Sequence, residues 1–370
     1  MIEIERTPDP RTMSSSRSAH LAAVRLLRRA AEREPSGLPW VSAYLDLRPP
    51  ADAARPSVRE AKVVLRDRLD ESLGSLPAHG EAHDSVVADG ERIQRILDGE
   101  AAERERGVAV IACHGDGVHE ELRTWTPFES RVEIGPLPFL VPLAHLADHE
   151  PSLVAIADTN TLRLFVSQPG RLEELPAIDD EPDDYTRTEA GGWSQARYQR
   201  HVDAHRGEFA RQVARIIELT MEREGAERLI LAGDEVAIPR LRRDLPKAVA
   251  ARVREILRME LRATLDEIEG KALPIIARSE EADARDAADR LVGAVAAGGL
   301  GVGRIGPVGR ALEMGQGLEL LLDPAGPPSD DEANELVRSA ARADTRITFV
   351  PGHEGLRRLG GVGLLLRFRA

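Results

Sequence analysis

Short apolar runs, each closed by glycine, proline or a polar turn, most constrain what this chain can fold into. Runs of this length and composition are typical of buried β-strands. Four of them are "WVSAYLDL", "GVAVIAC", "LVAIAD" and "RLILAGDE". The segment "HLAAVRLLRRAAERE", whose apolar residues recur at helical spacing, precedes the first of them, and "SVREAKVVLRDRLDESLGSL" lies between the first two and also predicts a helix. Strands that alternate with amphipathic helices predict an α/β protein.

The length of the chain predicts several domains. Its 370 residues exceed what one hydrophobic core usually serves. The proline-rich stretch "PLPFLVPLAHLADHEPS" indicates a first boundary near residue 148, because prolines interrupt helices and strands. We predict a disordered tail over 1–20, an N-terminal α/β domain over 21–147, a middle domain over 148–272 and a C-terminal domain over 273–370.

The middle segment begins with three short strands, "LVAIAD", "LRLFVS" and "GRLEEL", whose short connections predict an antiparallel meander. A long helix follows, with one apolar stripe that includes Phe209, Val213 and Ile217. "RLILAGDE" then predicts a buried strand and "VAIPRLRRDLP" a short helix, whereas "VREILRMELRA" fits either a strand or a helix, of which we favour the strand. In the last third, "ALEMGQGLELLLDP" and "LGGVGLLLRF" belong to an alternation that predicts a compact α/β/α sandwich.

Composition excludes several classes of protein. No apolar run approaches the ~18–20 residues that cross a bilayer, and the first residues lack the apolar core of a signal peptide. The single cysteine, Cys113, excludes an internal disulfide framework and is expected to be a buried small hydrophobe. The net charge of −13 argues against non-specific coating of nucleic acid. We expect a cytoplasmic protein with neither a membrane nor a DNA partner.

One segment opposes the charge of the whole chain. Residues 187–215 hold six arginines and three acids, and the stretch "EAGGWSQARYQRH" lies among them. Gly191 and Gly192 permit positive φ and a close approach to another surface. Ser194 can cap the helix that follows, whose N-terminus favours anions. This pattern suits a loop inserted into an RNA cavity, and it equally suits a capped helix with an exposed aromatic residue.

Other patterns match binding motifs weakly. "GVGRIG", Gly301 to Gly306, has the spacing of a dinucleotide-binding loop, but a helix is expected before it, so we predict a glycine-rich turn. Two histidine pairs and the loop "CHGDGVH" have the residue types of metal ligands, although exposed helix histidines and a polar loop explain them equally well. These residues are His145 with His149, His201 with His205, and Cys113, His114, Asp116 and His119.

Two aspartates follow predicted strands. Asp158 and Asp234 could hold the metal ions of a nuclease, and aspartate is also an ordinary turn residue. A metal-dependent nuclease is therefore one alternative. The chain has no GxSxG elbow and no GxxxxGKS loop, and we otherwise expect neither a metal nor a cofactor.

The stretch around Gly191 resembles the archaeal and eukaryotic class I translation release factors and their relative Pelota, in particular the bacterial branch of that superfamily. Such release factors carry Gly-Gly-Gln at the head of a basic helix that reads roughly QSAxRFxRxR. This chain has Gly191-Gly192-Trp193-Ser194-Gln195 followed by Arg197-Tyr198-x-Arg200. "ALEMG" with "LELLL", and "LGGVGLLLRF", are similar to the family's third domain. "VSAYLDL" and "ERIQRILDG...GVAVIAC" are similar to parts of its first domain.

Two departures separate the chain from the family pattern. When the helix is aligned on Arg197-Tyr198-x-Arg200, Trp193 falls where the family has its glutamine, and Gln195 lies two positions later. The first domain has neither an Asn-Ile-Lys-Ser loop nor a Tyr-x-Cys-x-x-x-Phe motif. Stop-codon decoding is therefore not expected.

The resemblance implies three α/β domains, the middle one like ribonuclease H in topology and the last like the release-factor third domain. It also implies a protein that enters the ribosomal A site and promotes hydrolysis of peptidyl-tRNA in a rescue or stress role, as a catalyst only when docked. Gly191 and Gly192 would shape the loop, and Gln195 would orient the attacking water. The implied RNA-binding residues are Trp193, Arg197, Tyr198, Arg200 and Arg206. The implied partners are the ribosome, its rRNA and peptidyl-tRNA, with an elongation-type GTPase as a candidate for delivery.

A second interpretation is a ribosome dormancy factor that occupies the A site and cleaves nothing. Trp193 would then stack on an exposed base, a contact worth ~1–3 kcal/mol. Peptide release from loaded ribosomes separates this interpretation from the first.

Overall fold

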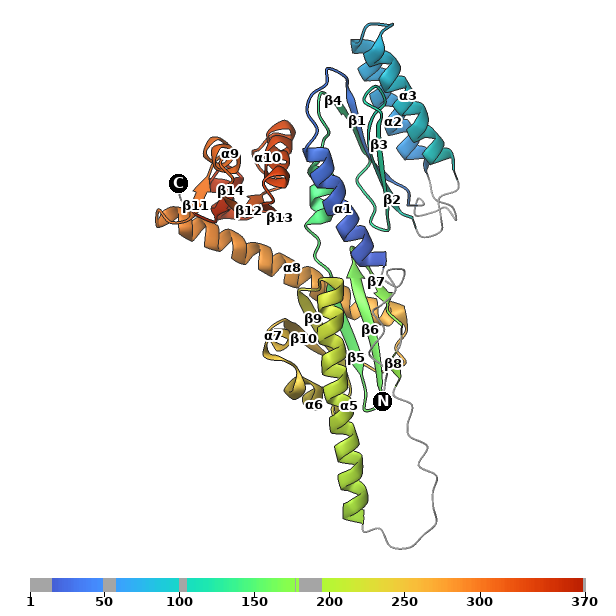
Figure 1. The fold of residues 1–370 in the computed structure, drawn as a ribbon, viewed down its shortest axis with the longest axis vertical. Helices are drawn as coiled ribbons and strands as arrows, with labels where there is room; N and C mark the ends of the chain where they lie inside the picture. The colour runs from blue at the N-terminus through green and yellow to red at the C-terminus, as the bar shows by residue number, and fades with distance from the viewer. Residues whose placement is uncertain (1–14, 49–57, 100–104, 177, 180–194, 369–370) are drawn as a thin grey trace. The chain divides into compact units, whose positions relative to one another are not determined.

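The computed structural model describes residues 15–48, 58–99, 105–176, 178–179 and 195–368, with only the backbone described over 15–19, 178–179 and 195–206. These residues form three β-sheets with helices packed on them, which confirms the predicted α/β class (Figure 1). They divide into two compact units, one built on residues 150–280 and the other on residues 19–149 and 281–370. No helix within the described ranges is long and apolar enough to cross a membrane.

The first sheet is antiparallel, with the strand order β3-β2-β1-β4. Its segment comprises α1 (Ser15–Ala31), β1 (Trp40–Asp46), α2 (Val58–Ser75), α3 (Glu81–Asp98), β2 (Gly107–Cys113), β3 (Val118–Thr124), β4 (Arg131–Gly135) and α4 (Val141–Ala147). Alternation along β1 directs Trp40 and Tyr44 to the face covered by α1 and α4, and Val41 and Leu45 to the face covered by α2 and α3. Helix α1 begins at Ser15, inside the tail predicted over 1–20, because serine is well suited to a helix start.

The last sheet has the strand order β11-β14-β12-β13. Its segment comprises α8 (Leu265–Ala296), β11 (Gly301–Gly303), α9 (Ile305–Glu313), β12 (Gly317–Leu322), α10 (Asp330–Arg342), β13 (Arg346–Phe349), α11 (Glu354–Arg358) and β14 (Val362–Leu366). Helices α9 and α10 bury one face of the sheet, and α11 with the second half of α8 buries the other. This is the predicted α/β/α sandwich.

The glycine-rich stretch before α9 is not the turn that the sequence predicts. Gly301 to Gly303 form strand β11, which pairs with β14. A Cβ on Gly303 would lie 3.0 Å from the Leu359 side chain. Tight packing therefore accounts for this glycine without a bound nucleotide.

One polar face of α10 joins the first and last sheets within their unit. Arg131 donates to Asp330 at 2.6 Å, and Arg342 lies 2.8 Å from Glu34. Between them, the Asn334 side chain accepts the Leu140 N–H at 2.6 Å and donates to the Pro138 carbonyl at 3.0 Å. Positions 330, 334 and 342 are spaced by multiples of four residues, which places them on one face of the helix. Two segments that the sequence assigns to separate domains thus pack together.

The middle sheet has the strand order β10-β9-β5-β6-β7, with β8 beside β6. Its segment comprises β5 (Ser152–Ala157), β6 (Thr161–Gln168), β7 (Arg171–Glu174), β8 (Ile178–Asp179), α5 (Gln195–Glu224), β9 (Arg228–Gly233), α6 (Ala237–Asp244), α7 (Lys247–Ala250) and β10 (Val253–Arg258). Strands β5, β6 and β7 form the predicted antiparallel meander, and β5, β9 and β10 run parallel. This order is the predicted ribonuclease-H-like topology.

Helices cover both faces of the middle sheet. Helix α5, drawn yellow-green in Figure 1, packs with α6 on one face, and the first half of α8 packs on the other. Helix α8 continues through Pro274, so the predicted domain boundary at residue 272 falls inside a helix.

Candidate functional site

The helix after the glycine pair is α5, and its first residue is Gln195. It is 30 residues long, which confirms the long arginine-bearing helix that the sequence predicts. Gly191, Gly192 and Trp193 lie outside the described residues. Gln195 therefore stands where the first backbone N–H groups of the helix have no intrahelical partner and favour negative charge.

The C-terminal two-thirds of α5 are anchored by one buried stripe. Phe209, Val213, Ile217 and Met221 pack against the middle sheet and are each at most 5% exposed. Burial of such a side chain contributes roughly 1.5–3 kcal/mol, so this part of the helix is firmly held. Position 206 lies seven residues before Val213 and eleven before Ile217, which is about two and three turns. It is therefore in line with the buried stripe.

The other predicted arginines follow a different line along α5. Position 200 lies eleven residues before Arg211, and position 197 lies eighteen residues before Arg215, which is about three and five turns. Arg211 and Arg215 are both exposed, and Arg215 also forms an ion pair with Glu218 about one turn further along α5. Helical periodicity thus puts positions 197 and 200 on one line with two exposed arginines that the sequence analysis did not assign to the site. Counting in helical turns would have found them.

The two aspartates considered for a nuclease lie at the same edge of the middle sheet. Strands β5 and β9 are parallel neighbours in which Ala157 is opposite Gly233, and Asp158 and Asp234 follow these two residues. One Asp158 oxygen accepts two backbone N–H groups at 2.7 and 2.8 Å, and one Asp234 oxygen accepts two at 2.6 and 2.8 Å. Each carboxylate closes a turn. Across the described ranges, no three metal-ligating side chains gather in one place.

The histidine pairs have different positions. His201 and His205 belong to the part of α5 of which only the backbone is described. His145, on α4, stacks on Phe349 of the last sheet with 4.6 Å between ring centroids. Burial lowers the pKa of His145, so the neutral ring is favoured in this contact. His145 therefore packs two parts of the unit together.

The loop that ends β2 is tied to α3 by two hydrogen bonds. The His114 N–H donates to the Asp89 carboxylate at 2.8 Å, and the Gly115 N–H donates to Ser85 Oγ at 3.0 Å. Cys113 is buried, as predicted, and burial raises the pKa of its thiol. Backbone N–H groups of this loop thus hold the strand end against α3.

Replacing the buried Asp89 by asparagine is expected to raise the free energy of unfolding at neutral pH. Burial raises the pKa of this carboxyl, so its stabilising effect is present below the pKa of the unfolded chain and is lost as pH rises through the folded-state value. Asparagine keeps an acceptor for the His114 N–H and cannot ionise. Denaturant unfolding should show a larger gain at pH 7.5 than at pH 4. Glu91→Gln, at an exposed position of α3, is the control, and an equal gain at both pH values would contradict the explanation.

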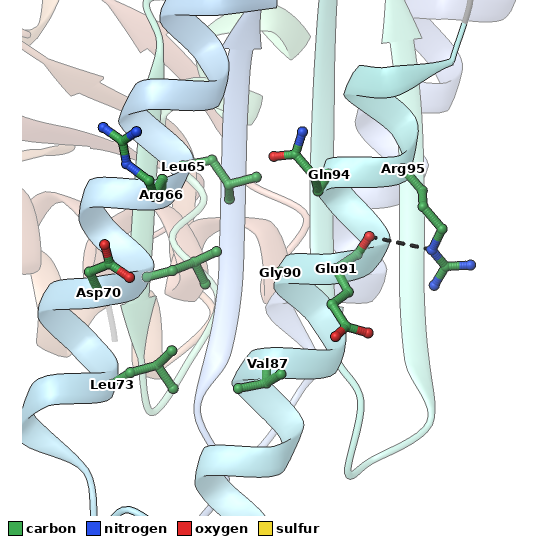
Figure 2. Close-up of a pocket in the computed structure, with 10 residues that line it drawn as sticks. Leu65, Arg66, Asp70, Leu73, Val87, Gly90, Glu91, Gln94 and Arg95 are labelled. Carbon is green, nitrogen blue, oxygen red and sulfur yellow. Dashed lines mark hydrogen bonds between the residues drawn. The ribbon is translucent and has the colours of Figure 1, made fainter.

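A hollow of about 500 Å³ lies between α2 and α3. Figure 2 shows Leu65, Leu73 and Val87 pointing into the space between the helices. A Cβ on Gly90 would lie 2.6 Å from Cδ1 of Leu69, so a larger residue there would require the end of this leucine side chain to shift. The hollow contains none of the predicted site residues and pairs no nucleophile with a base, so it is best described as an apolar seam.

Comparison with known proteins relates the middle of the chain to one family. Residues 138–277 match the sequence profile of bacterial archaeo-eukaryotic release factor family 10, and this range includes the whole middle sheet and α5. No curated protein sequence matches the chain at a significant level.

Three solved structures that match the chain concern translation. Ribosome-bound archaeal Pelota, solved with ABCE1, is 14% identical, with 97% of this chain and 96% of that chain covered and a TM-score of 0.44. S. cerevisiae Dom34 is 11% identical, with 71% and 80% covered and a TM-score of 0.44. The archaeal translation termination factor aRF1 is 16% identical, with 97% and 100% covered and a TM-score of 0.27.

Proposed function

Through residues 138–277 the chain belongs to the bacterial branch of the archaeo-eukaryotic release factor superfamily, and we propose that it enters the ribosomal A site and promotes hydrolysis of peptidyl-tRNA. The observation that carries the proposal is the start of α5 at Gln195, directly after the Gly191-Gly192-Trp193-Ser194 stretch. A long helix anchored at its far end can present such a stretch well away from the body of the middle unit. The motifs that read stop codons are absent from the sequence, so the proposed role is ribosome rescue. The proposed location is the cytoplasm.

The proposed chemistry is attack of water on the ester that joins the nascent peptide to tRNA. The C–O bond to the tRNA ribose breaks, the peptide leaves with a free carboxylate, and the tRNA oxygen receives a proton. Gln195 would orient the water, and Gly191 and Gly192 would give the loop the freedom to approach the ester. Positioning of this kind can supply up to ~7–11 kcal/mol of the barrier reduction. The ribosome would supply the surrounding electrostatics.

The arginine line of α5, formed by positions 197, 200, 211 and 215, would hold the protein on RNA. Guanidinium groups bind phosphate through two parallel hydrogen bonds, which orients the helix as well as attracting it. Positions 197, 200, 211 and 215 are in line, whereas position 206 follows the buried stripe. An elongation-type GTPase is a candidate for delivery on the strength of the resemblance alone.

A quadruple variant should bind 70S ribosomes much more weakly than the parent. It combines Arg197→Gln, Arg200→Gln, Arg211→Gln and Arg215→Gln. The slope of log K against log salt is negative, and each lost phosphate contact reduces its magnitude by about 0.7–0.9. The loss of four contacts therefore reduces it by about three. Sedimentation at several salt concentrations measures the slope. Arg206 lies on a different line of the helix and is a predicted RNA-binding residue too, so adding Arg206→Gln should reduce the magnitude of the slope by about a further 0.7–0.9. An unchanged slope in the quadruple variant would show that the arginine line of α5 is only a solvated face of the helix.

One sequence feature favours the dormancy alternative. Trp193 stands where the family has its glutamine, and an indole can stack on a base but cannot orient water as an amide does. In that case the protein would occupy the A site without releasing the peptide.

A further inference from the structure

The stretch from α6 to β10 is strongly basic within an acidic chain. Residues 237–258 hold seven lysines or arginines and two acids, an excess of five positive charges, whereas the whole chain carries −13. The excess over 187–215, which drew attention in the sequence, is only three. The seven cations are Arg240, Arg242, Arg243, Lys247, Arg252, Arg254 and Arg258.

These cations follow one edge of the middle unit, from α6 through α7 and along strand β10. Strand β10 is an edge strand, and among the described residues it pairs only with β9. Helices α6 and α7 form the connection that returns the chain from β9 to this edge, so the helix ends and the edge strand are neighbours. The pairing sets Arg258 opposite Gly233, beside the loop that leads into α6. Ile256, two residues earlier on the open edge, is 41% exposed.

Acidic neighbours neutralise only part of this charge. Arg258 forms an ion pair with Glu235, and Arg252 lies 3.4 Å from Glu227. Arg242 and Lys247 are both exposed, and no carboxylate among the described residues forms an ion pair with either of them. Two uncompensated cations therefore face solvent five residues apart in sequence, where α6 gives way to α7.

Ordinary structural roles explain some of these residues. Arg242 lies in the last turn of α6, where a cation interacts favourably with the helix dipole by ~0.3–1 kcal/mol. Charges on β10 also protect an open sheet edge from pairing with another chain. Neither role accounts for Lys247, because it is not on β10 and α7 is a single turn of four residues. The charge excess is larger than these roles require.

We infer that the α6–β10 surface, residues 237–258, binds the phosphate backbone of RNA and is a second contact with the ribosome beside the arginine line of α5. Concentrated and partly unpaired positive charge on a net-negative protein complements a polyanion and little else. Phosphate contacts read no bases, so binding should be independent of RNA sequence. The inference rests on the proposed function for its ribosomal setting, but its charge argument is independent of Gln195.

The test removes the two uncompensated cations from the full-length protein. Arg242→Gln combined with Lys247→Gln should reduce the magnitude of the negative slope of log K against log salt by about 1.4–1.8. The same reduction is expected for 70S ribosomes and for a mixed-sequence RNA duplex. The matched control is Arg285→Gln combined with Arg358→Gln. It removes the same charge from two exposed arginines that are paired, each at 3.2 Å, with Glu281 and Glu354. The control should leave both slopes unchanged.

Each outcome decides between the two proposals. Ribosome binding by the parent with an unchanged slope in the double variant would overturn the α6–β10 surface and leave the proposed function standing. Failure of the parent to bind ribosomes would overturn the proposed function, and the RNA duplex would then decide on the surface alone. Capture of poly-glutamate without any binding of the duplex would assign an acidic protein as the partner and overturn the inference.

Folding controls keep the test decisive. Denaturant midpoints of the double variant and of the parent should agree, because both side chains are exposed. Should the double variant unfold, Lys247→Gln alone should give half the slope change, and Lys247→Arg should restore the parent slope. The inference would be overturned if the slope of log K against log salt varied with the denaturant midpoint of these variants and not with their charge.

Discussion

Gln195→Ala is expected to slow peptide release from ribosomes that carry peptidyl-tRNA in the P site by roughly 100-fold, with little loss of ribosome affinity. Loss of a positioning group acts mainly in the transition state, so the rate at saturating protein should fall while the dissociation constant stays nearly constant. Single-turnover release at saturating protein gives the rate, and sedimentation gives the affinity.

Two neighbouring substitutions make the result specific. Gly192→Val should also impair release, because a β-branched residue denies the loop positive φ. Trp193→Ala separates the two candidate functions. In a release factor it should weaken binding by one stacking contact, ~1–3 kcal/mol, and leave turnover at saturation unchanged. In a dormancy factor it should be the most damaging of the three.

One set of results would rule out hydrolysis. It is a parent protein without release above background, a Gln195→Ala variant that binds ribosomes like the parent, and a Trp193→Ala variant that dissociates. The protein would then be a dormancy factor that occupies the A site without releasing the peptide.

Gly233→Ala is expected to destabilise the middle unit by about 3 kcal/mol or more. Gly233 ends β9 with φ of 150°, and a Cβ there would lie 2.0 Å from the Ala157 carbonyl oxygen. Backbone strain of this kind costs ~1–3 kcal/mol, and overpacking adds ~1–3 kcal/mol. The oxygen cannot move aside without disturbing the parallel pairing of β5 and β9, on which α5 also packs.

Gly225→Ala is the matched control for this prediction. Gly225 has φ of 66°, and a Cβ there would have nothing within 4 Å, so alanine should cost only the backbone term of ~1–2 kcal/mol. Hydrogen exchange at the amides of β5 and β9 measures the stability of the sheet directly. Equal losses in both variants would show that contact with Ala157 does not determine the need for glycine.

Local patterns in the sequence determined the class of the protein and most of its elements. β1, α5, β9 and β10 were all predicted, because alternation and helical spacing report burial within a few residues. β3 and β4 were not predicted. They lie on the two edges of the first sheet, and their partial exposure weakens the apolar pattern that identifies a strand.

The candidate site divides in the same way. The glycine pair, Gln195 and the arginines after it are sequence features, and the family resemblance gave them a role. Counting in helical turns already puts Arg211 and Arg215 in line with positions 197 and 200. Only the structure shows that these two arginines are exposed, because exposure depends on which face of α5 meets the sheet.

Tertiary structure alone decided how distant segments combine. Asn334 joins the last sheet to residues 138 and 140 of the first segment, and Arg258 lies beside the start of α6 through its pairing with β9. Such contacts depend on which apolar faces bury each other, and a single sequence carries no local record of that choice. Periodicity is a property of neighbours along the chain, whereas a binding surface is a property of neighbours in space.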